Sequence, residues 1–210
     1  MPNISFGGLS RINNDLIPKT FVVLDPAKGG DDLGVTGMVN HLPSLKEKNI
    51  NLAVCYHLAG YLVASGIQIA MTRCDDSNMG IQERVDKVNK LSPDFILSVS
   101  QAEENLYVPM LYRWGYDPQS ELVATFLKKH LDNWNWLNEP VGINKRRIGV
   151  VGKTYAPCVH VGIGNITKWK EHANSFADPD FINDYARILA TGLLESFTRV
   201  TWLSSKIRSH

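Results

Sequence analysis

Histidine and cysteine, the side chains that most often hold metal ions, are few in this chain and poorly spaced for that role. There are six histidines and three cysteines. No two histidines have HxxxH or HxH spacing and no CxxC motif is present. An odd number of cysteines gives no disulfide framework, so neither that nor a zinc knuckle is indicated. The residues are His41, His57, His130, His160, His172, His210, Cys55, Cys74 and Cys158.

Serine chemistry also lacks a signature. Ser98 or Ser100 could pair with His160, but no GxSxG elbow is present, and that motif is what marks the nucleophile of one large hydrolase class. The GKT at 152–154 lacks the upstream glycine spacing of a phosphate-binding loop. Neither acyl transfer nor nucleotide binding is favoured.

Composition fits one ordinary globular domain. The chain has 210 residues, 44% of them hydrophobic and 20% charged, which is enough to bury a single sizeable core. A formal net charge of +1 lacks the basic surplus that nucleic acid or an acidic membrane surface would attract. No window approaches the length of a membrane span, so we expect no membrane insertion.

Apolar runs with strand-like patterns alternate with helical patterns along the chain. This alternation predicts a single α/β domain with a largely parallel six-stranded sheet flanked by helices. The predicted strands are 21–24, 67–71, 95–99, 109–112, 148–151 and 159–163.

Four helices are predicted, at about 47–64, 81–91, 120–131 and 181–199. In the first, Leu52, Tyr56, Ala59 and Leu62 recur at spacings of three and four, which favours one buried face, with Gly66 as the stop. In the second, Ile81, Val85 and Val88 should face inward and Pro93 should end the helix.

Several segments resemble one enzyme family. They are VVLDPAKGG at 22–30, EKNINLAV from Glu47, MTRCDD at 71–76, IQERVDKVNKLSPDFILSVS at 81–100 and APCVHVGIGNIT at 156–167. Together they are similar to the zinc-dependent N-acetylmuramoyl-L-alanine amidases, which cut the bond between the glycan sugar and the stem peptide of peptidoglycan. The resemblance runs from about Thr20 to Phe197 and implies the amidase fold.

The resemblance also implies which residues should carry the chemistry. The family holds zinc with a histidine after the first strand, a glutamate opening the first helix and a histidine ending the third predicted strand, and a second glutamate is the general base. These positions here are Lys28, Glu47, Ser100 and Gly162. Ammonium and glycine cannot replace those groups and a serine hydroxyl is a poor zinc ligand. We therefore expect a degenerate site with no catalytic residues and no cofactor.

Two further expectations concern this degenerate site. Lys28 should pair with Glu47 in place of the metal, unless both side chains are simply solvated at the lip of a groove. A relocated zinc site built from Glu47 and His160 is the weak alternative, because His160 lies two residues before Gly162 on one strand face. A histidine satisfied in or beside the core is favoured, and His57 is an equally weak candidate ligand.

Aromatic residues offer the remaining candidate binding surface. Trp134 and Trp136 lie in a polar NWNW segment, and Trp114, Tyr112 and Tyr116 lie nearby in sequence. Such rings could stack on sugars or fill a pocket in a partner. Packing under loops is the equal alternative for Trp134 and Trp136.

Residues 1–19 and 200–210 are predicted to be extensions of an amidase-like domain at 20–199, the second being basic. No apolar stretch of signal-peptide length follows the N-terminus, so a cytoplasmic or virion-associated protein is expected. These features favour an inactive, structural or partner-binding component, such as part of a phage tail or contractile injection assembly. The alternatives are a module that binds muropeptide without cleaving it and an active amidase.

Overall fold

The computed structural model describes residues 20–39, 42–101, 109–115, 117–134, 136, 139–167 and 170–199. The predicted extensions at 1–19 and 200–210 lie outside these ranges. Within them no helix is long and apolar enough to span a membrane.

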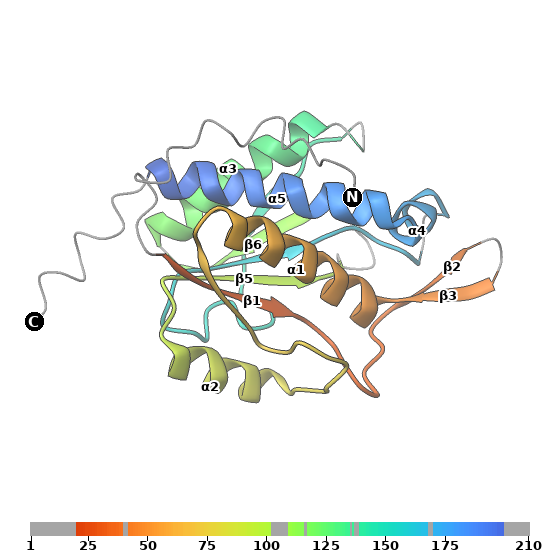
Figure 1. The fold of residues 1–210 in the computed structure, drawn as a ribbon, viewed down its shortest axis with the longest axis horizontal. Helices are drawn as coiled ribbons and strands as arrows, with labels where there is room; N and C mark the ends of the chain where they lie inside the picture. The colour runs from red at the N-terminus through yellow and green to blue at the C-terminus, as the bar shows by residue number, and fades with distance from the viewer. Residues whose placement is uncertain are drawn as a thin grey trace, which may run out of the picture.

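A six-stranded sheet forms the centre of the fold (Figure 1). Its order is β4 (Gln68–Met71), β1 (Phe21–Pro26), β5 (Phe95–Ser100), β8 (Cys158–Gly162), β6 (Met110–Arg113) and β7 (Gly142–Lys145). The first four strands are parallel, while β6 runs antiparallel to β8 and parallel to β7. The predicted α/β class and largely parallel sheet are confirmed.

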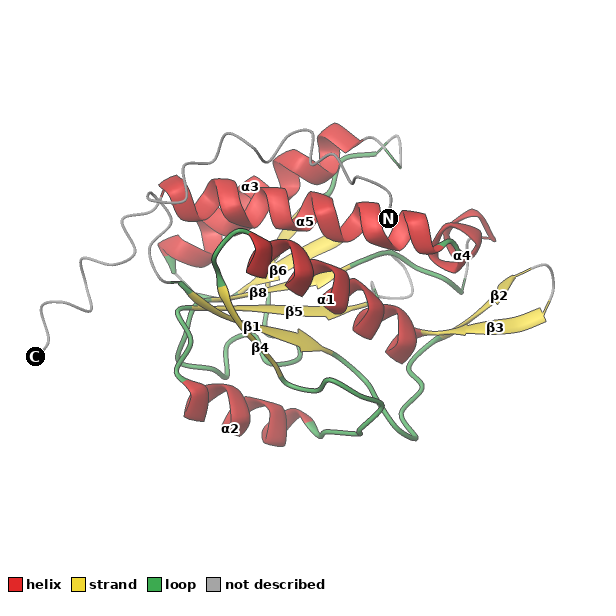
Figure 2. Cartoon of the chain, viewed as in Figure 1, coloured by secondary structure: helices red, strands yellow, loops and turns green. Residues whose placement is uncertain are grey.

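Helices cover both faces of this sheet (Figure 2). On one face lie α1 (Glu47–Ala64), α3 (Pro118–Trp134) and α5 (Pro179–Arg199), and on the other lies α2 (Ile81–Leu91). Because strand side chains alternate between faces, Val22 and Leu24 join the large core under α1 and α5, whereas Val23 joins the small core under α2.

One predicted strand is wrong. Residues 148–151 form turns, and β7 lies earlier in the chain, at Gly142–Lys145. Gly149 and Gly152 have φ values of 53° and 77°, which strands do not tolerate. Val150 and Val151 are nevertheless fully buried in the core under α2, so the apolar run packs as a turn.

The helix predictions hold with local corrections. Helix α1 begins at Glu47, and Gly66 follows its C-cap with φ 85°. Tyr56 and Ile81 are 48% and 44% exposed, so their predicted inward orientation is wrong. Helix α3 runs on to Trp134, which therefore lies on a helix and not in a loop. The short helix α4 (Lys170–Ala177) and the hairpin of β2 (Thr36–Val39) and β3 (Leu42–Lys46) were not predicted.

Candidate functional site at the carboxyl edge of the sheet

The fold brings the residues singled out by sequence to one edge of the sheet. Ser100 ends β5 and Gly162 ends β8, and their Cα atoms are register partners. Glu47 opens α1 and lies against them, since the backbone N–H of Gln101 donates to its Oε1 at 3.1 Å. Lys28 follows β1, whose end also lies beside β5. The carboxyl ends of parallel strands lie at the same edge of a sheet, and α/β proteins commonly bind their ligands in the crevice at that edge.

Glu47 has its carboxylate oxygens bonded within the protein. The side chain is only 4% exposed. Its Oε2 accepts the N–H of Val35 at 2.9 Å, and its Oε1 accepts the N–H of Gln101 and, at 3.4 Å, the amide of Asn51. A Cβ added to Gly34, whose φ is 66°, would lie 2.3 Å from Oε2. Glu47 therefore ties the loop before β2 to the end of β5.

The predicted pairing of Lys28 with Glu47 is wrong. The ammonium of Lys28 lies 3.1 Å from Asp32, and these side chains are 36% and 48% exposed. Lys28 has φ 68° in a loop where Asp32 follows four residues later. Glu47 needs no ammonium partner, because backbone N–H groups favour a charged carboxylate in the same way. The alternative of two solvated side chains fails for Glu47, which is buried.

His160 joins two serines inside the sheet. Its Nε2 lies 2.7 Å from the hydroxyl of Ser100, and its Nδ1 lies 3.1 Å from that of Ser98. Ser98 donates to Asp25 at 2.7 Å, so its oxygen accepts the proton of Nδ1. The Ser100 hydroxyl lies within reach of both Nε2 and the carbonyl of Gln101, at 2.9 Å, and can donate its single proton to one of them at a time. The expectation of a histidine satisfied beside the core is confirmed, since its ring nitrogens both engage serine hydroxyls.

Burial keeps His160 neutral. Desolvation lowers its pKa to about 4, and the charge of Asp25 only partly opposes this shift. A general base works best with a pKa near the working pH. The Ser100 and His160 pair that sequence did not favour is thus present as a contact, but its histidine is a weak base. We assign it no acyl-transfer chemistry.

Asp25 anchors this network and was missed by the sequence analysis. It is fully buried and its carboxylate accepts from Arg84 at 2.9 and 3.1 Å, from Thr72 at 2.8 Å and from Ser98. Arg84 reaches it from α2 with a side chain 8% exposed. The available signal was an acidic residue inside the apolar run VVLDP, because a buried carboxylate needs a partner.

No cluster of metal-binding side chains occurs among the described residues: nowhere do three or more His, Cys, Asp or Glu gather as a metal site would require. At this edge the ammonium of Lys28 is paired with Asp32, Gly162 has no side chain, and the oxygens of Glu47 already accept hydrogen bonds. His57 is exposed on α1, and His41, His172 and His210 lie where side chains are not described.

Trp134 and Trp136 pack against each other and against neighbouring helices. Their ring centroids are 5.9 Å apart, and Phe181 lies 5.1 Å from Trp134 and 4.7 Å from Trp136. The cavity beside them holds about 10 Å³, no more than one water. Both rings pack against the core but remain partly exposed, so a binding role for this pair stays a prediction.

Solved structures of similar fold are amidases. The catalytic domain of CwlV from Bacillus (Paenibacillus) polymyxa var. colistinus superposes with a TM-score of 0.74 at 24% identity, covering 84% of this chain and 97% of that domain. AmiC2 of Nostoc punctiforme gives 0.69 at 26% identity over 85% of this chain and 97% of its own. CwlD of Clostridioides difficile, solved in complex with the GerS lipoprotein, gives 0.75 at 19% identity over 86% and 100%.

Curated relatives point the same way. LytC of Bacillus subtilis (strain 168) is 30% identical over 47% of this chain, and AmiA of Escherichia coli (strain K12) is 33% identical over 39%. Both are N-acetylmuramoyl-L-alanine amidases, and the alignments span 18% and 27% of their lengths. The family model of N-acetylmuramoyl-L-alanine amidase matches residues 22–195. This chain therefore belongs to the N-acetylmuramoyl-L-alanine amidase family.

Proposed function

We propose that this chain lacks zinc-dependent hydrolysis and serves as a structural or partner-binding domain built on the amidase fold. The observation that carries the proposal is the environment of Glu47, whose carboxylate accepts backbone N–H groups from Val35 and Gln101. A zinc ion would have to displace these bonds, would gain no good second ligand from Lys28 or Ser100, and would find no general base at Gly162.

The chemistry of the side chains supports the same conclusion. Catalytic zinc needs three protein ligands and an open position where bound water ionises near neutral pH. The described side chains at this edge fit such a centre poorly, because Glu47 is the only suitable donor at the four positions that the family uses. Ser100 hydrogen-bonds to His160, and Gly162 can move no proton.

The partner in this proposal is another protein, within a larger assembly such as a phage tail or contractile injection machine. The similarity to CwlD, a protein solved in complex with a lipoprotein, supports the use of this fold in protein complexes. A second candidate is a module that binds muropeptide without cleaving it. Gln101 favours that candidate, because its side-chain amide is buried with neither its oxygen nor its nitrogen bonded to any described group.

The test is cleavage of purified muropeptide by the native protein, with added zinc and with chelator. We expect no release of stem peptide under either condition. Saturable binding without product would favour the muropeptide-binding module. Product that disappears on chelation would overturn the proposal and establish an active amidase.

A double variant sharpens this test. Lys28→His with Ser100→His should restore part of a zinc site and take up zinc, yet should not cleave muropeptide, because Gly162 still supplies no base. The matched control is Lys153→His with Ser65→His, a pair that lies away from this edge. A folded double variant that bound no more zinc than the control would show that these positions are wrongly assigned.

A further inference from the structure

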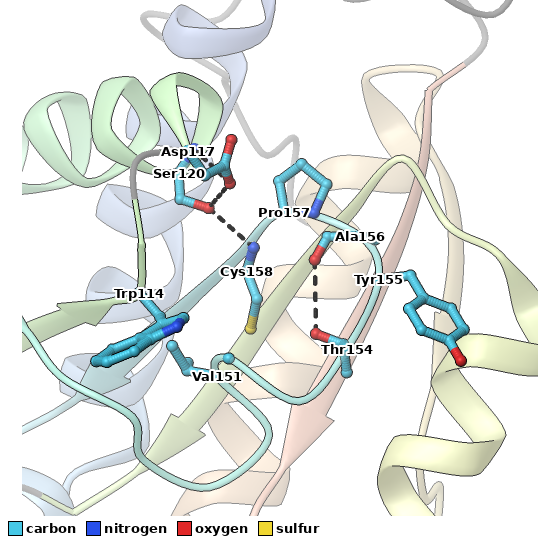
Figure 3. A pocket seen from close by; sticks show the side chains of 10 residues that line it. Trp114, Asp117, Ser120, Val151, Thr154, Tyr155, Ala156, Pro157 and Cys158 are labelled. Atoms are coloured by element: carbon cyan, nitrogen blue, oxygen red, sulfur yellow. Dashed lines mark hydrogen bonds between the residues drawn. The ribbon is translucent and has the colours of Figure 1, made fainter.

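A cavity lies at the other end of β8, away from the edge described above. Strand β8 begins at Cys158, which lines the cavity, and ends at Gly162. The cavity holds about 220 Å³ between the start of α3 and the turns at 148–157 (Figure 3). We call it the Trp114 pocket, and the residues that matter here are Trp114, Asp117, Ser120, Thr154, Tyr155 and Cys158.

Two exposed aromatic rings border this pocket. Trp114 is 42% exposed and Tyr155 is 91% exposed, and Figure 3 shows the two rings on opposite sides of Cys158. Gly152 packs closely against Trp114, because a Cβ on Gly152 would lie 2.8 Å from the indole Cγ. The packed Trp114 ring beside the cavity offers an apolar face to a ligand.

The charges around the pocket favour an uncharged ligand. The guanidinium of Arg147 lies 4.7 Å from the centroid of the Trp114 ring, so a second cation there would be repelled. Asp117 would repel an anion, and its carboxylate already accepts the N–H groups of Gln119 at 3.1 Å and Ser120 at 3.3 Å. Arg147 and Asp117 carry opposite charges, so the charge beside the pocket is balanced and a ligand without net charge suits it best.

Hydroxyl groups on a ligand would suit the hydrogen-bonding groups that remain available in the pocket. Thr154 donates a long bond of 3.5 Å to the carbonyl of Ala156 and also contacts the Cys158 thiol. Both are weak partners, so the hydroxyl can turn to a ligand. The Asp117 carboxylate also accepts the Ser120 hydroxyl, so three of its roughly four lone-pair sites are used and one remains for a ligand hydroxyl. Burial raises the pKa of the Cys158 thiol well above its usual range, which excludes a reactive thiolate here.

We propose that the Trp114 pocket binds one uncharged sugar ring, with the apolar face of the sugar against Trp114 and its hydroxyls bonded to Thr154 and Asp117. The cavity is smaller than the roughly 300–1,000 Å³ typical of drug-sized ligands, which fits a single ring. This inference is independent of the zinc question, because the pocket and Gly162 lie at opposite ends of β8.

The experiment is a titration of the full chain with N-acetylglucosamine, followed by backbone amide chemical shifts. Saturable binding in the millimolar range should shift the amides of residues 114, 117, 119, 120, 150–156 and 158. Trp114→Ala should weaken binding at least about fivefold, as expected for a lost stacking contact. Thr154→Val, which keeps the shape and removes the hydroxyl, should weaken it about threefold to tenfold.

Tyr56→Ala is the matched control, since Tyr56 is about as exposed as Trp114 and lies on α1. The affinity of this variant for N-acetylglucosamine should equal that of wild type. Shifts confined to another surface, or none at all, would overturn the proposal. So would wild-type affinity in the folded Thr154→Val and Trp114→Ala proteins. Preferential binding of tetramethylammonium or inorganic phosphate at these amides would also overturn it, in favour of a charged ligand.

Discussion

At the carboxyl end of β8, His160 and Ser100 bond to each other, and Glu47 nearby accepts backbone N–H groups. At the amino end, Cys158 borders a cavity of about 220 Å³ with an exposed tryptophan and a threonine hydroxyl that is only weakly bonded. The family places its chemistry at the first end. In this chain, the sugar site that we propose lies at the second end.

This difference concerns hydrogen-bond satisfaction more than residue type. Both ends carry carboxylates and hydroxyls, yet Asp25 receives bonds from Arg84, Thr72 and Ser98. The Asp25 carboxylate is thereby satisfied, which favours rigidity, whereas the Gln101 amide at this edge has no hydrogen-bond partner among the described residues. A ligand must break such bonds before it can use these groups, whereas a half-exposed ring requires no bond to be broken.

Breaking the ion pair between Asp25 and Arg84 should cause the largest loss in the free energy of unfolding among the predicted effects. Asp25→Asn leaves the guanidinium of Arg84 buried without its charge partner, and removing one partner of a buried pair costs about 3–5 kcal/mol. Denaturant unfolding should show this loss in the free energy of unfolding. Asp32→Asn at the exposed pair with Lys28 is the control and should cost less than about 1 kcal/mol. Equal effects would remove the distinction between a structural network and a surface pair.

The second largest effect should be a pH dependence of stability that arises from His160. Its pKa is about 4 in the folded chain, below the usual 6.5, so the unfolded chain binds a proton first as pH falls. The folded state then loses about 3 kcal/mol between pH 6.5 and pH 4, at roughly 1.4 kcal/mol per unit. Above pH 6.5 this loss is absent.

His160→Gln should remove that part of the pH dependence. The difference in unfolding free energy between wild type and variant should therefore shrink as pH falls from 7 to 4.5, while carboxylates such as Asp25 titrate in both proteins. His57→Gln, on the exposed face of α1, should leave the profile unchanged. Parallel profiles for wild type and His160→Gln would show that the ring is not held neutral.

Removing the Glu47 carboxylate should have a smaller effect. Glu47→Ala leaves the N–H groups of Val35 and Gln101 without their acceptor, at a cost of about 1–3 kcal/mol. Glu83→Ala is the control, because Glu83 also lies in the first turn of a helix but is exposed. Thermal unfolding of both variants with and without zinc decides the point. Zinc that stabilised wild type and not Glu47→Ala would contradict the structural role.

Substitution of Lys28 should have the smallest effect on stability. Lys28→Gln removes one half of an exposed pair, so the free energy of unfolding should change by less than about 0.5 kcal/mol. A double-mutant cycle with Asp32 should give a small coupling, and one with Glu47 should give none. Strong coupling to Glu47 would restore the salt bridge predicted from the sequence.

The sequence predicted the elements whose patterns are local. Helix α1 begins at Glu47 and stops before Gly66, because periodicity and a stop signal agree there. The run at 148–151 failed because buried turns and buried strands share the same apolar residues, and only the glycines at 149 and 152 distinguish them. The hairpin of β2 and β3 was missed because Gly37 and Pro43 interrupt the alternation.

Sequence placed Glu47, Ser100 and Gly162 correctly at one edge, since the resemblance fixes positions on strands and helices. It could not identify the partners of Glu47, because backbone N–H groups leave no mark in the residue sequence. Asp25 escaped notice for a related reason. Its partner Arg84 lies 59 positions away on α2, and no short motif joins the two.

The most direct measurement is the zinc content of native protein purified without chelator or metal-affinity tag. We expect less than about a tenth of an equivalent per chain. A true zinc site would retain close to one ion per chain, whereas Glu47 is the only good ligand at the family's ligand positions and cannot hold zinc alone. Close to one equivalent would contradict this expectation. Zinc would then have a rebuilt site at this edge, and Glu47 and His160 would be the first residues to substitute.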